Sequence, residues 1–430
     1  MLKFNPIFFK LAINSLKSRK GSVFLTLLAI IVSVYVLIGV EQIRQQTKQN
    51  FNSTIAGTDL IVGARTGDIN LLLYAVFHMG AATQNISWKT YQELGALSSV
   101  DWAVPISLGD SHQGYRVTAT TPDYFKHYRY AELQPLQFAT GRTFKDVYDV
   151  VLGAEVARQL GYQLGDELVL AHGLGATSFS SHKDKPFRVS GVLEATSTPV
   201  DSSLYISLSG MEAIHIGWHS GVNSNPTAIS DAPSLTPKSV TAVMLGLKQK
   251  TAIFRLQRVI NQYREEALLA ILPGVTLAKL WQITSVMEDS LRLIALLILL
   301  SSLLGLVAML LASIRERQRE IAVMRVMGAS PWFIFSLIEI EVMFVTFVGY
   351  VLGLLSLAGS FELAKHLALE QFELHLSANL FNLEQLIYLG LILTAAFIAG
   401  LIPAIKPAMN AAGLIPAIMA YKQALSIRLD

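Results

Sequence analysis

The chain of 430 residues contains no cysteine and little charge. The lack of cysteine excludes disulfide bonds and thiolate chemistry, so a folded domain in this chain must be stable on its hydrophobic core. Asp, Glu, Lys and Arg make up 15% of the residues, whereas they make up about a quarter of a typical soluble protein. Apolar residues make up 52%, and a membrane protein is therefore the first expectation.

Known catalytic and nucleotide-binding motifs are also missing. The sequence contains no G-x-x-x-x-G-K-[ST] motif, so we do not expect the chain to bind ATP through a P-loop of its own. It also lacks a Gly-x-Ser-x-Gly nucleophile elbow and a His-Glu-x-x-His zinc motif. We predict that the chain is not an enzyme, holds no cofactor and does not bind nucleic acid.

The apolar residues gather in four runs. These runs lie near Val23–Val40, Leu293–Leu311, Phe333–Leu357 and Leu383–Ile405. Each is close to the roughly 20 residues with which an α-helix crosses a bilayer. The segment from Glu41 to about Asp289 has mixed polarity and is long enough for a folded domain. The pattern predicts an α-helical membrane protein with four transmembrane helices and a large extracytoplasmic domain inserted between helices one and two.

The placement of basic residues predicts the orientation of the helices. They gather before the first run, between the second and third, and after the fourth: Lys3, Lys10, Lys17, Arg19, Lys20, Arg315, Arg317, Arg319, Arg325, Lys406, Lys422 and Arg428. The loop between the third and fourth runs has one, Lys365. The positive-inside rule therefore places both termini and the Arg-rich loop in the cytoplasm and the large segment outside.

The large segment mixes strand-like and helix-like patterns, which predicts an α+β domain. Val150–Leu152 and Val240–Leu247 are typical of strands, whereas Ala154–Leu160 and Ala252–Leu272 have helical spacing. Leu277–Ser290 also has helical spacing, with no helix breaker before the second run, so we expect one long helix that includes an outward stalk. Three parts result: residues 1–41 (lead-in and first transmembrane helix), 42–276 (extracytoplasmic α+β domain) and 277–430 (stalk, remaining transmembrane helices and a short cytoplasmic tail).

A dense block of charge, IRERQREIAVMRVMGASPWFI (Ile314–Ile334), joins the second and third runs. On a helix, Glu316 and Arg319, and Arg317 and Glu320, are i,i+3 partners. Gly328 can end that helix, and Pro331 prevents its continuation. Its apolar face would consist of Ile321, Val323, Met324, Val326 and Met327. The residues permit two interpretations, a solvated loop that only fixes topology or a short amphipathic helix that contacts another protein.

This loop resembles the signature R-E-I-x-x-x-[KR]-x-x-G-A of the FtsX/MacB-type ABC transporter permease family. The matching residues are Arg319, Glu320, Ile321, Arg325, Gly328 and Ala329. The large segment is similar to the family's periplasmic domain through the strings VGARTGDINLLLYAVFHMG, TTPDYF, GRTF and VVLGAEVARQLGYQLGD. PAMNAAGLIPAIMA (Pro407–Ala420) resembles the family's ending, in which a proline-led turn follows the fourth span. The resemblance covers nearly the whole chain.

The resemblance implies a stand-alone permease subunit, with a MacB-like periplasmic core domain, in the bacterial inner membrane. ATP and Mg²⁺ would bind to a separate cytoplasmic ATPase, and its closure would move the periplasmic domain, a mechanism called mechanotransmission. The other implied partners are a second permease chain, identical or not, a periplasmic or outer-membrane accessory protein, and membrane lipids. The residues expected to contact the ATPase are Arg315, Arg317, Arg319, Glu320, Ile321, Met324, Arg325, Gly328 and Ala329.

The third run carries two acidic residues and two glycines that need an explanation. A carboxylate deep in lipid is unfavourable, so Glu339 and Glu341 should face the bundle, pair, or lie near the headgroups. We favour a position at the membrane shoulder over a role in handling protons or substrate. Gly349 and Gly353 form a small-xxx-small pair, which we expect to pack helices within one chain.

Two histidines are weak candidates for a metal site. His215 and His219 are spaced i,i+4, and on a helix they would share one face with Glu212 nearby. Gly217 and Gly221 argue against a continuous helix there.

Three functions therefore stay open. The first is a permease subunit that exports or extracts an envelope substrate. The second is an FtsX-like signalling permease that regulates an extracytoplasmic enzyme without transport. The third is a membrane-anchored metal-binding or hydrolytic domain.

Overall fold

The computed structural model describes residues 20–171, 185–216, 218–219, 222–223, 235–316, 318–372 and 383–411. The chain divides into two compact units. Residues 46–286 form most of one, the α+β domain, and the long helices before and after them form the other, the helical unit. The N-terminal lead-in and most of the C-terminal tail predicted from the sequence lie outside the described residues.

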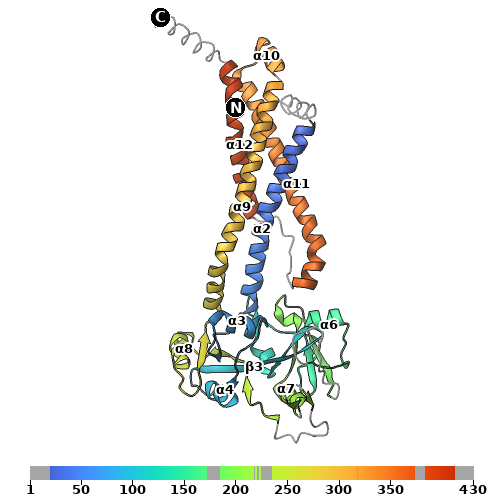
Figure 1. The fold of residues 1–430 in the computed structure, drawn as a ribbon, viewed down its shortest axis with the longest axis vertical. Coiled ribbons are helices and arrows are strands. Elements are labelled where there is room, and N and C mark those ends of the chain that lie inside the picture. Colours follow the sequence, from blue (N-terminus) through green and yellow to red (C-terminus); the bar gives the residue numbers. More distant parts are fainter. Residues whose placement is uncertain are drawn as a thin grey trace. The chain divides into compact units, whose positions relative to one another are not determined.

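The helical unit contains five described helices (Figure 1). They are α2 (Lys20–Thr54), α9 (Pro273–Glu316), α10 (Gln318–Val326), α11 (Pro331–Phe372) and α12 (Leu383–Ala411). Among the described residues, three stretches are long and apolar enough to cross a membrane: Lys20–Thr54, Pro273–Glu316 and Pro331–Leu363. A shorter apolar helical stretch covers Gln385–Leu401 within α12. The helix α12 continues through Pro407, where the resemblance implied a turn.

The helix α9 joins the segment Leu277–Ser290 to the second apolar run without interruption. Pro273 is its first residue, a position where the missing proline N–H is not needed. No further proline occurs before Pro331, so nothing breaks the backbone hydrogen bonds over 44 residues.

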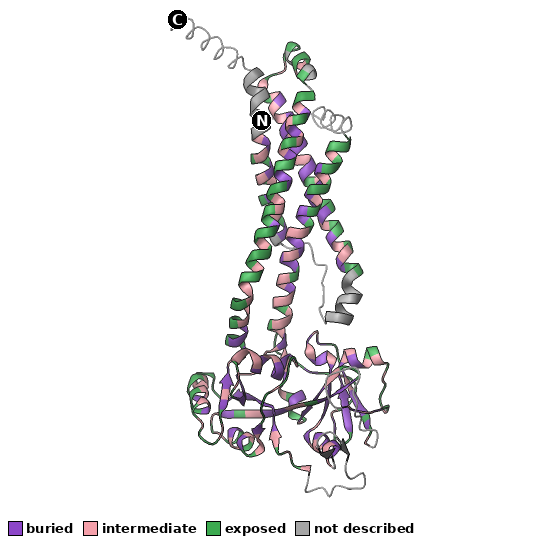
Figure 2. Cartoon of the chain, in the orientation of Figure 1, coloured by how far each residue is buried: buried purple, intermediate pink, exposed green. Residues whose placement is uncertain are grey.

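The helices pack through apolar side chains and through close approaches at glycine. Buried residues of α2 (Ile30, Val34), α9 (Leu306) and α11 (Val342) belong to one hydrophobic cluster. A Cβ atom on Gly349 would lie 2.6 Å from Ile30, and one on Gly353 would lie 2.9 Å from Val34. The small-xxx-small pair therefore packs α11 against α2 within one chain, as predicted. Figure 2 shows exposed residues along the outer faces of these helices.

The α+β domain is built on one mixed sheet of ten strands. In spatial order the main path is β16 (Leu268–Ile271), β1 (Leu60–Ala64), β15 (Ala242–Leu247), β3 (Val100–His112), β4 (Tyr115–Thr120), β11 (Ser203–Ser207), β8 (Asp149–Leu152), β10 (Phe187–Leu193) and β7 (Phe138–Gly141). The short β9 (Glu167–Leu168) also pairs with β10. The pairs β4–β11 and β8–β10 are parallel, and the other pairs are antiparallel.

Short helices and three two-stranded pairs surround this sheet. The helices are α3 (Asp68–Val76), α4 (Trp88–Gly95), α5 (Asp123–His127), α6 (Ala154–Leu160), α7 (Leu208–His215), α8 (Ile253–Asn261) and the 3-10 turns η1 (Pro199–Ser202) and η3 (Lys250–Ala252). The pairs are β2 (Ile86–Ser87) with β14 (Ser239–Val240), β5 (Arg129–Tyr130) with β6 (Gln134–Pro135), and β12 (Trp218–His219) with β13 (Val222–Asn223).

Every residue of β1, β8 and β15 is buried. Strands that are covered on both faces read as continuous apolar runs, which is why these segments lack polar alternation. Successive residues still point to opposite faces: Leu60 and Val62 belong to one hydrophobic cluster and Ile61 to the other. The α+β architecture predicted from the sequence is confirmed.

One predicted element is wrong. The helical pattern over Ala252–Leu272 ends at Asn261, and residues 268–271 form the edge strand β16. The side chains of α8 close that edge, because Asn261 Oδ1 accepts from the Ala270 N–H (2.7 Å) and Gln257 Nε2 donates to the Ala270 carbonyl (2.9 Å). Pairing with β1 outweighs the local helical spacing, since it satisfies the other backbone groups of the segment.

Candidate functional site

The Arg-rich loop folds as the short helix α10 followed by a tight turn. Gly328 has φ of +96°, a conformation that glycine adopts without strain. The Ala329 N–H donates to the Met324 carbonyl (2.9 Å) and the Met327 N–H to the Val323 carbonyl (3.0 Å). The six-to-one bond from Ala329 to Met324 is that of a Schellman motif. Gly328 therefore ends α10, as the sequence predicts.

The same turn starts α11 without a flexible linker. Ser330 caps the helix, because its side-chain oxygen accepts from the Phe333 N–H (3.3 Å). Pro331 is the first helical residue, where its fixed φ favours the helix. The backbone from Met327 to Ser330 is thus held from both sides.

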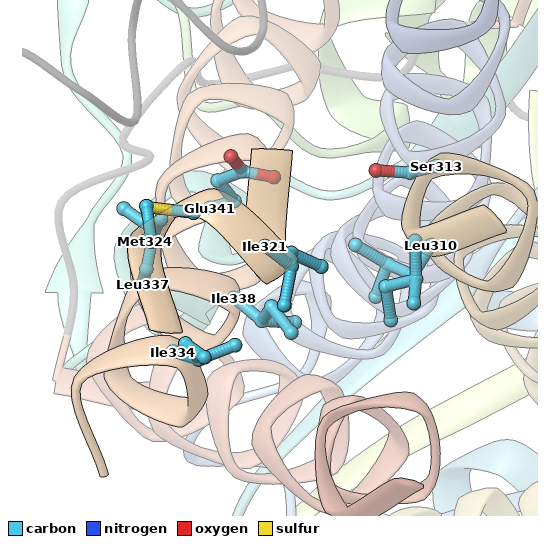
Figure 3. Close-up of a pocket in the computed structure, with 9 residues that line it drawn as sticks. Leu310, Ser313, Ile321, Met324, Ile334, Leu337, Ile338 and Glu341 are labelled. Carbon is cyan, nitrogen blue, oxygen red and sulfur yellow. The ribbon is translucent and has the colours of Figure 1, made fainter. Parts of the chain in front are cut away.

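One side of α10 faces the other helices of its unit (Figure 3). Ile321 and Met324 line a cavity of about 10 Å³, which is too small for more than one water molecule. Its other walls come from α9 and α11: Leu310, Ser313, Ile314, Ile334, Leu337, Ile338 and Glu341. The helix α10 is therefore seated on α9 and α11 by these two apolar side chains.

The other residues of the predicted apolar face are exposed. Val323 is 57% exposed, Val326 89%, Met327 75% and Trp332, in the first turn of α11, 75%. We call these four residues the turn surface. The amphipathic helix predicted from the sequence is thus divided, with Ile321 and Met324 on its inner side and Val323, Val326 and Met327 on its outer side. Sequence reasoning missed Trp332, although an exposed aromatic residue directly after a helix-starting proline was available as a signal.

The charged residues of the loop are described only in part. Arg315 and Glu316 are exposed at the end of α9. Arg317 and the side chains of Arg319, Glu320 and Arg325 lie outside the described residues. The predicted i,i+3 pairs and the expected contacts of these side chains therefore stay predictions.

Comparison with known families covers both units. Residues 23–262 match the MacB-like periplasmic core domain, and residues 292–410 match the FtsX-like permease C-terminal domain. The chain belongs to the FtsX/MacB-type family of ABC transporter permeases. It is thereby a multi-pass inner-membrane protein with a periplasmic domain, of a family that works with a cytoplasmic ABC ATPase.

Solved structures of such domains are similar to part of this permease. The periplasmic region of MacB from Actinobacillus actinomycetemcomitans has 13% sequence identity and a TM-score of 0.34, over 53% of this chain and 94% of that one. The extracellular domain of the ABC-type transporter YknZ from Gram-positive bacteria has 14% identity and a TM-score of 0.29, over 50% of this chain and 99% of that one. No curated protein sequence matches the permease.

Both acidic residues of the third apolar run are buried in the helical unit. Glu339 is 5% exposed and Glu341 is 2% exposed. A Cβ atom on Gly400 of α12 would lie 2.9 Å from Glu339 Oε2, so the absence of a side chain there makes room for the carboxyl group. Glu341 lines the cavity behind Met324. The two side chains thus face the bundle, one toward α12 and one toward α10.

The structure does not place His215 and His219 on one helical face, as the predicted metal site requires. The helix α7 ends at His215, and His219 belongs to the strand β12, so the two residues do not share a helical face. His215 Nδ1–H donates to the Met211 carbonyl (2.6 Å), and its Nε2 lies 3.7 Å from Asp110 Oδ1. Burial alone lowers the pKa of His215, but the Asp110 carboxylate raises it above its usual value. Among the described residues, no group of three His, Cys, Asp or Glu side chains could hold a metal ion.

Proposed function

We propose that this permease couples ATP hydrolysis by a separate cytoplasmic ATPase to movement of its periplasmic α+β domain, for export or extraction of an envelope substrate. The observation that carries the proposal is the turn surface. Met327 and Trp332 are large, exposed and held by a backbone with little freedom. Aromatic residues and methionine are enriched in protein interfaces, and such anchors supply most of the binding energy.

A displacement of the turn surface would be transmitted to the other helices through the inner side of α10. Ile321 and Met324 contact the cavity walls formed by α9 and α11. A protein interior is close-packed, so a displacement of α10 displaces its neighbours rather than compressing them. The helix α9 then runs without a break to Pro273.

The helices α9 and α2 are each connected through the chain to one of two neighbouring strands of the periplasmic sheet. The helix α9 starts at Pro273, directly after β16 and Leu272, and α2 ends at Thr54, shortly before β1. The strands β1 and β16 are hydrogen-bonded to each other in antiparallel register. Movement of α2 and α9 is therefore delivered to one edge of the sheet through short covalent connections.

The remaining parts of the proposal come from the family. Four transmembrane helices, with α12 as the fourth, would place both termini in the cytoplasm. ATP and Mg²⁺ would bind to the ATPase, and two permease chains would form the complex together with a periplasmic or outer-membrane accessory protein. The same mechanics suit an FtsX-like signalling permease that regulates an extracytoplasmic enzyme. Stimulation of ATP hydrolysis by a candidate substrate would favour export over signalling.

Met327→Asp/Trp332→Asp is expected to reduce recovery of the ATPase at least about tenfold, since two interface anchors become charged. The ATPase is measured by mass spectrometry after the tagged full-length permease is purified from native membranes. Asp in the first turn of a helix is favourable, so Trp332→Asp leaves α11 intact. Arg319→Glu/Arg325→Glu tests the charged residues of the signature in the same way.

Phe254→Asp/Val259→Asp is the matched control. These two residues of α8 are 69% and 51% exposed, and the change in charge is the same, but they belong to the periplasmic domain. The control should recover the ATPase like the wild type. Equal recovery with Met327→Asp/Trp332→Asp, or no P-loop ATPase with any folded variant, would contradict the proposal.

A further inference from the structure

A cluster of five charged residues joins α2 to α9 where their apolar stretches end. Glu41 and Arg44 follow the first apolar run, and Glu288, Asp289 and Arg292 precede the second. All five belong to the helical unit. Neither the family signature nor the route of movement described above uses them.

Glu41 is the centre of the cluster and is 8% exposed. Its carboxylate accepts from Arg292 Nη2 of α9 (3.2 Å) and, within α2, from Arg44 and from Gln45 Nε2 (3.1 Å). Arg44 Nη1 in turn lies 3.5 Å from Glu288 Oε2 of α9. Arg292 is also 3.7 Å from Asp289.

The two pairs between the helices have opposite polarity. In one the acid is on α2 (Glu41 with Arg292), and in the other the acid is on α9 (Glu288 with Arg44). The residue numbers rise along α2 as they fall along α9, so the helices are antiparallel here. A slip of one helical turn, about 5.4 Å, would bring like charges together in either direction. One slip places Glu41 opposite Glu288, and the other places Arg44 opposite Arg292.

We propose that this cluster locks the register of α2 against α9, so that the two helices move as one lever and do not slide past each other. The inference rests on the proposed function, because α10 is seated on α9, and a slip of α9 against α2 would keep part of the displacement of α9 from reaching α2 and the strand β1 that follows it. Buried ion pairs contribute little net stability compared with apolar packing, and fixing the register of paired helices is their best-attested role. The apolar residues Ile43 and Leu291 of this region are 48% and 44% exposed, so they do not fix the register by themselves.

The test measures the register directly. The permease has no cysteine, so Val32→Cys and Leu291→Cys, which replace residues 47% and 44% exposed, give one pair of spin labels. Val32 lies nine residues before Glu41, the partner of Arg292, so the two labels are offset along the helix axes and their distance reports a slip. The full-length chain is reconstituted in lipid nanodiscs without ATPase, and the distance distribution is recorded by pulsed electron paramagnetic resonance. A locked register predicts one narrow distance.

Glu41→Arg/Arg44→Glu keeps the composition, the net charge and the pair within α2, but it places like charges in both pairs between the helices. We expect a broad distribution or a second population at a different distance, because a slip of one helical turn changes the axial offset of the two labels by about 5 Å. Adding Glu288→Arg and Arg292→Glu restores both pairs and should restore the single distance. If the first variant does not fold, Arg292→Gln, which removes one pair between the helices, is expected to broaden the distance.

An unchanged narrow distance in the folded Glu41→Arg/Arg44→Glu variant, or a broad one in the fourfold variant, would overturn the register lock. No ATPase is present in this experiment. Its failure is therefore separate from a failure of the turn surface to bind the ATPase.

Discussion

Gly153→Ala is expected to destabilise the periplasmic domain by about 3 kcal/mol or more. Gly153 follows β8 and precedes α6, and its N–H donates to the Ser203 carbonyl (2.9 Å). A Cβ atom would lie 2.3 Å from the carbonyl oxygens of both Val200 and Asp201. These are backbone atoms of η1, so they cannot rotate away as a side chain could.

Gly67→Ala is the matched control. Gly67 is also the residue before a helix, α3, with extended backbone angles like those of Gly153, but a Cβ atom there would contact nothing within 4 Å. Its substitution reports the cost of alanine at a helix N-cap alone, which is below about 1 kcal/mol relative to glycine. Thermal unfolding of the full-length protein should show Gly153→Ala at least about 5 °C below the control. Equal midpoints would show that η1 adapts and that the clash is not decisive.

Acidification from pH 7 to pH 5 is expected to destabilise the periplasmic domain through His78. His78 Nδ1–H donates to Ser203 Oγ (2.7 Å), whose own proton goes to the Pro199 carbonyl (3.0 Å). The ring also lies edge-on to Tyr205, with the ring centroids 6.4 Å apart. Burial, together with the nearby positive charge of Arg116, lowers the pKa of His78 to about 3.

The direction of this pH dependence follows from the protonation of His78 in the folded and the unfolded state. The folded form keeps His78 neutral until about pH 3, whereas the unfolded chain protonates it near its usual pKa of about 6.5. Between about pH 6.5 and pH 3 the unfolded state binds one more proton than the folded state, so the free energy of unfolding falls as the pH falls. The slope approaches about 1.4 kcal/mol per pH unit, and the stability contributed by the neutral ring is fully present only above about pH 6.5.

His78→Asn isolates this contribution. Asn tolerates the φ of +53° at this position, and its amide can still donate to Ser203. Urea unfolding of the full-length protein, followed by pulse proteolysis of the periplasmic domain at several pH values, should give a shallower slope between pH 5 and 6.5 for this variant. His215→Asn should change the slope in the opposite sense and at higher pH. Asp110 raises the pKa of His215, so the stability that its proton contributes is fully present below about pH 6.5 and is lost as the pH rises above that value. Parallel profiles for wild type and His78→Asn would rule out His78 as the source.

Much of the local structure could be predicted from residue patterns. Gly328 ends the helix of the Arg-rich loop as predicted, because glycine adopts a positive φ without strain. Pro331 was predicted only to prevent continuation of that helix, and in the structure it is also the first residue of the next one. The strands with continuous apolar runs, such as Val150–Leu152, were also identified. The absence of polar residues in such a run is itself a consequence of burial on both faces.

The strand β3 was not predicted from the sequence, and the segment around β16 was predicted as part of a helix. The 13-residue β3 contains Pro105, Gly109 and Asp110, residues that are depleted in strands. It forms because it pairs with β15 on one side and β4 on the other. In β16, the choice between helix and strand depends on β1, which lies about 200 residues earlier in the sequence.

Gly153, the glycine of the VVLG string, could be recognised as part of a family motif, but the sequence did not show why glycine is required there. The sequence places Gly153 between a strand and a helix, where many residues would fit. Only the backbone of η1, brought close by the fold, excludes every side chain at that position.

The sequence by itself determined the membrane class, the α+β periplasmic domain and the position of the loop that meets the ATPase in the proposed function. These features follow from hydropathy, periodicity and turn chemistry, which are local properties of the chain. The tertiary structure alone decided that Ile321 and Met324 anchor α10 while Met327 and Trp332 stay exposed, and that Glu41 meets Arg292. The reason is physical: which face of a helix is buried, and which charge finds a partner, depends on the surfaces of elements that are distant in the sequence.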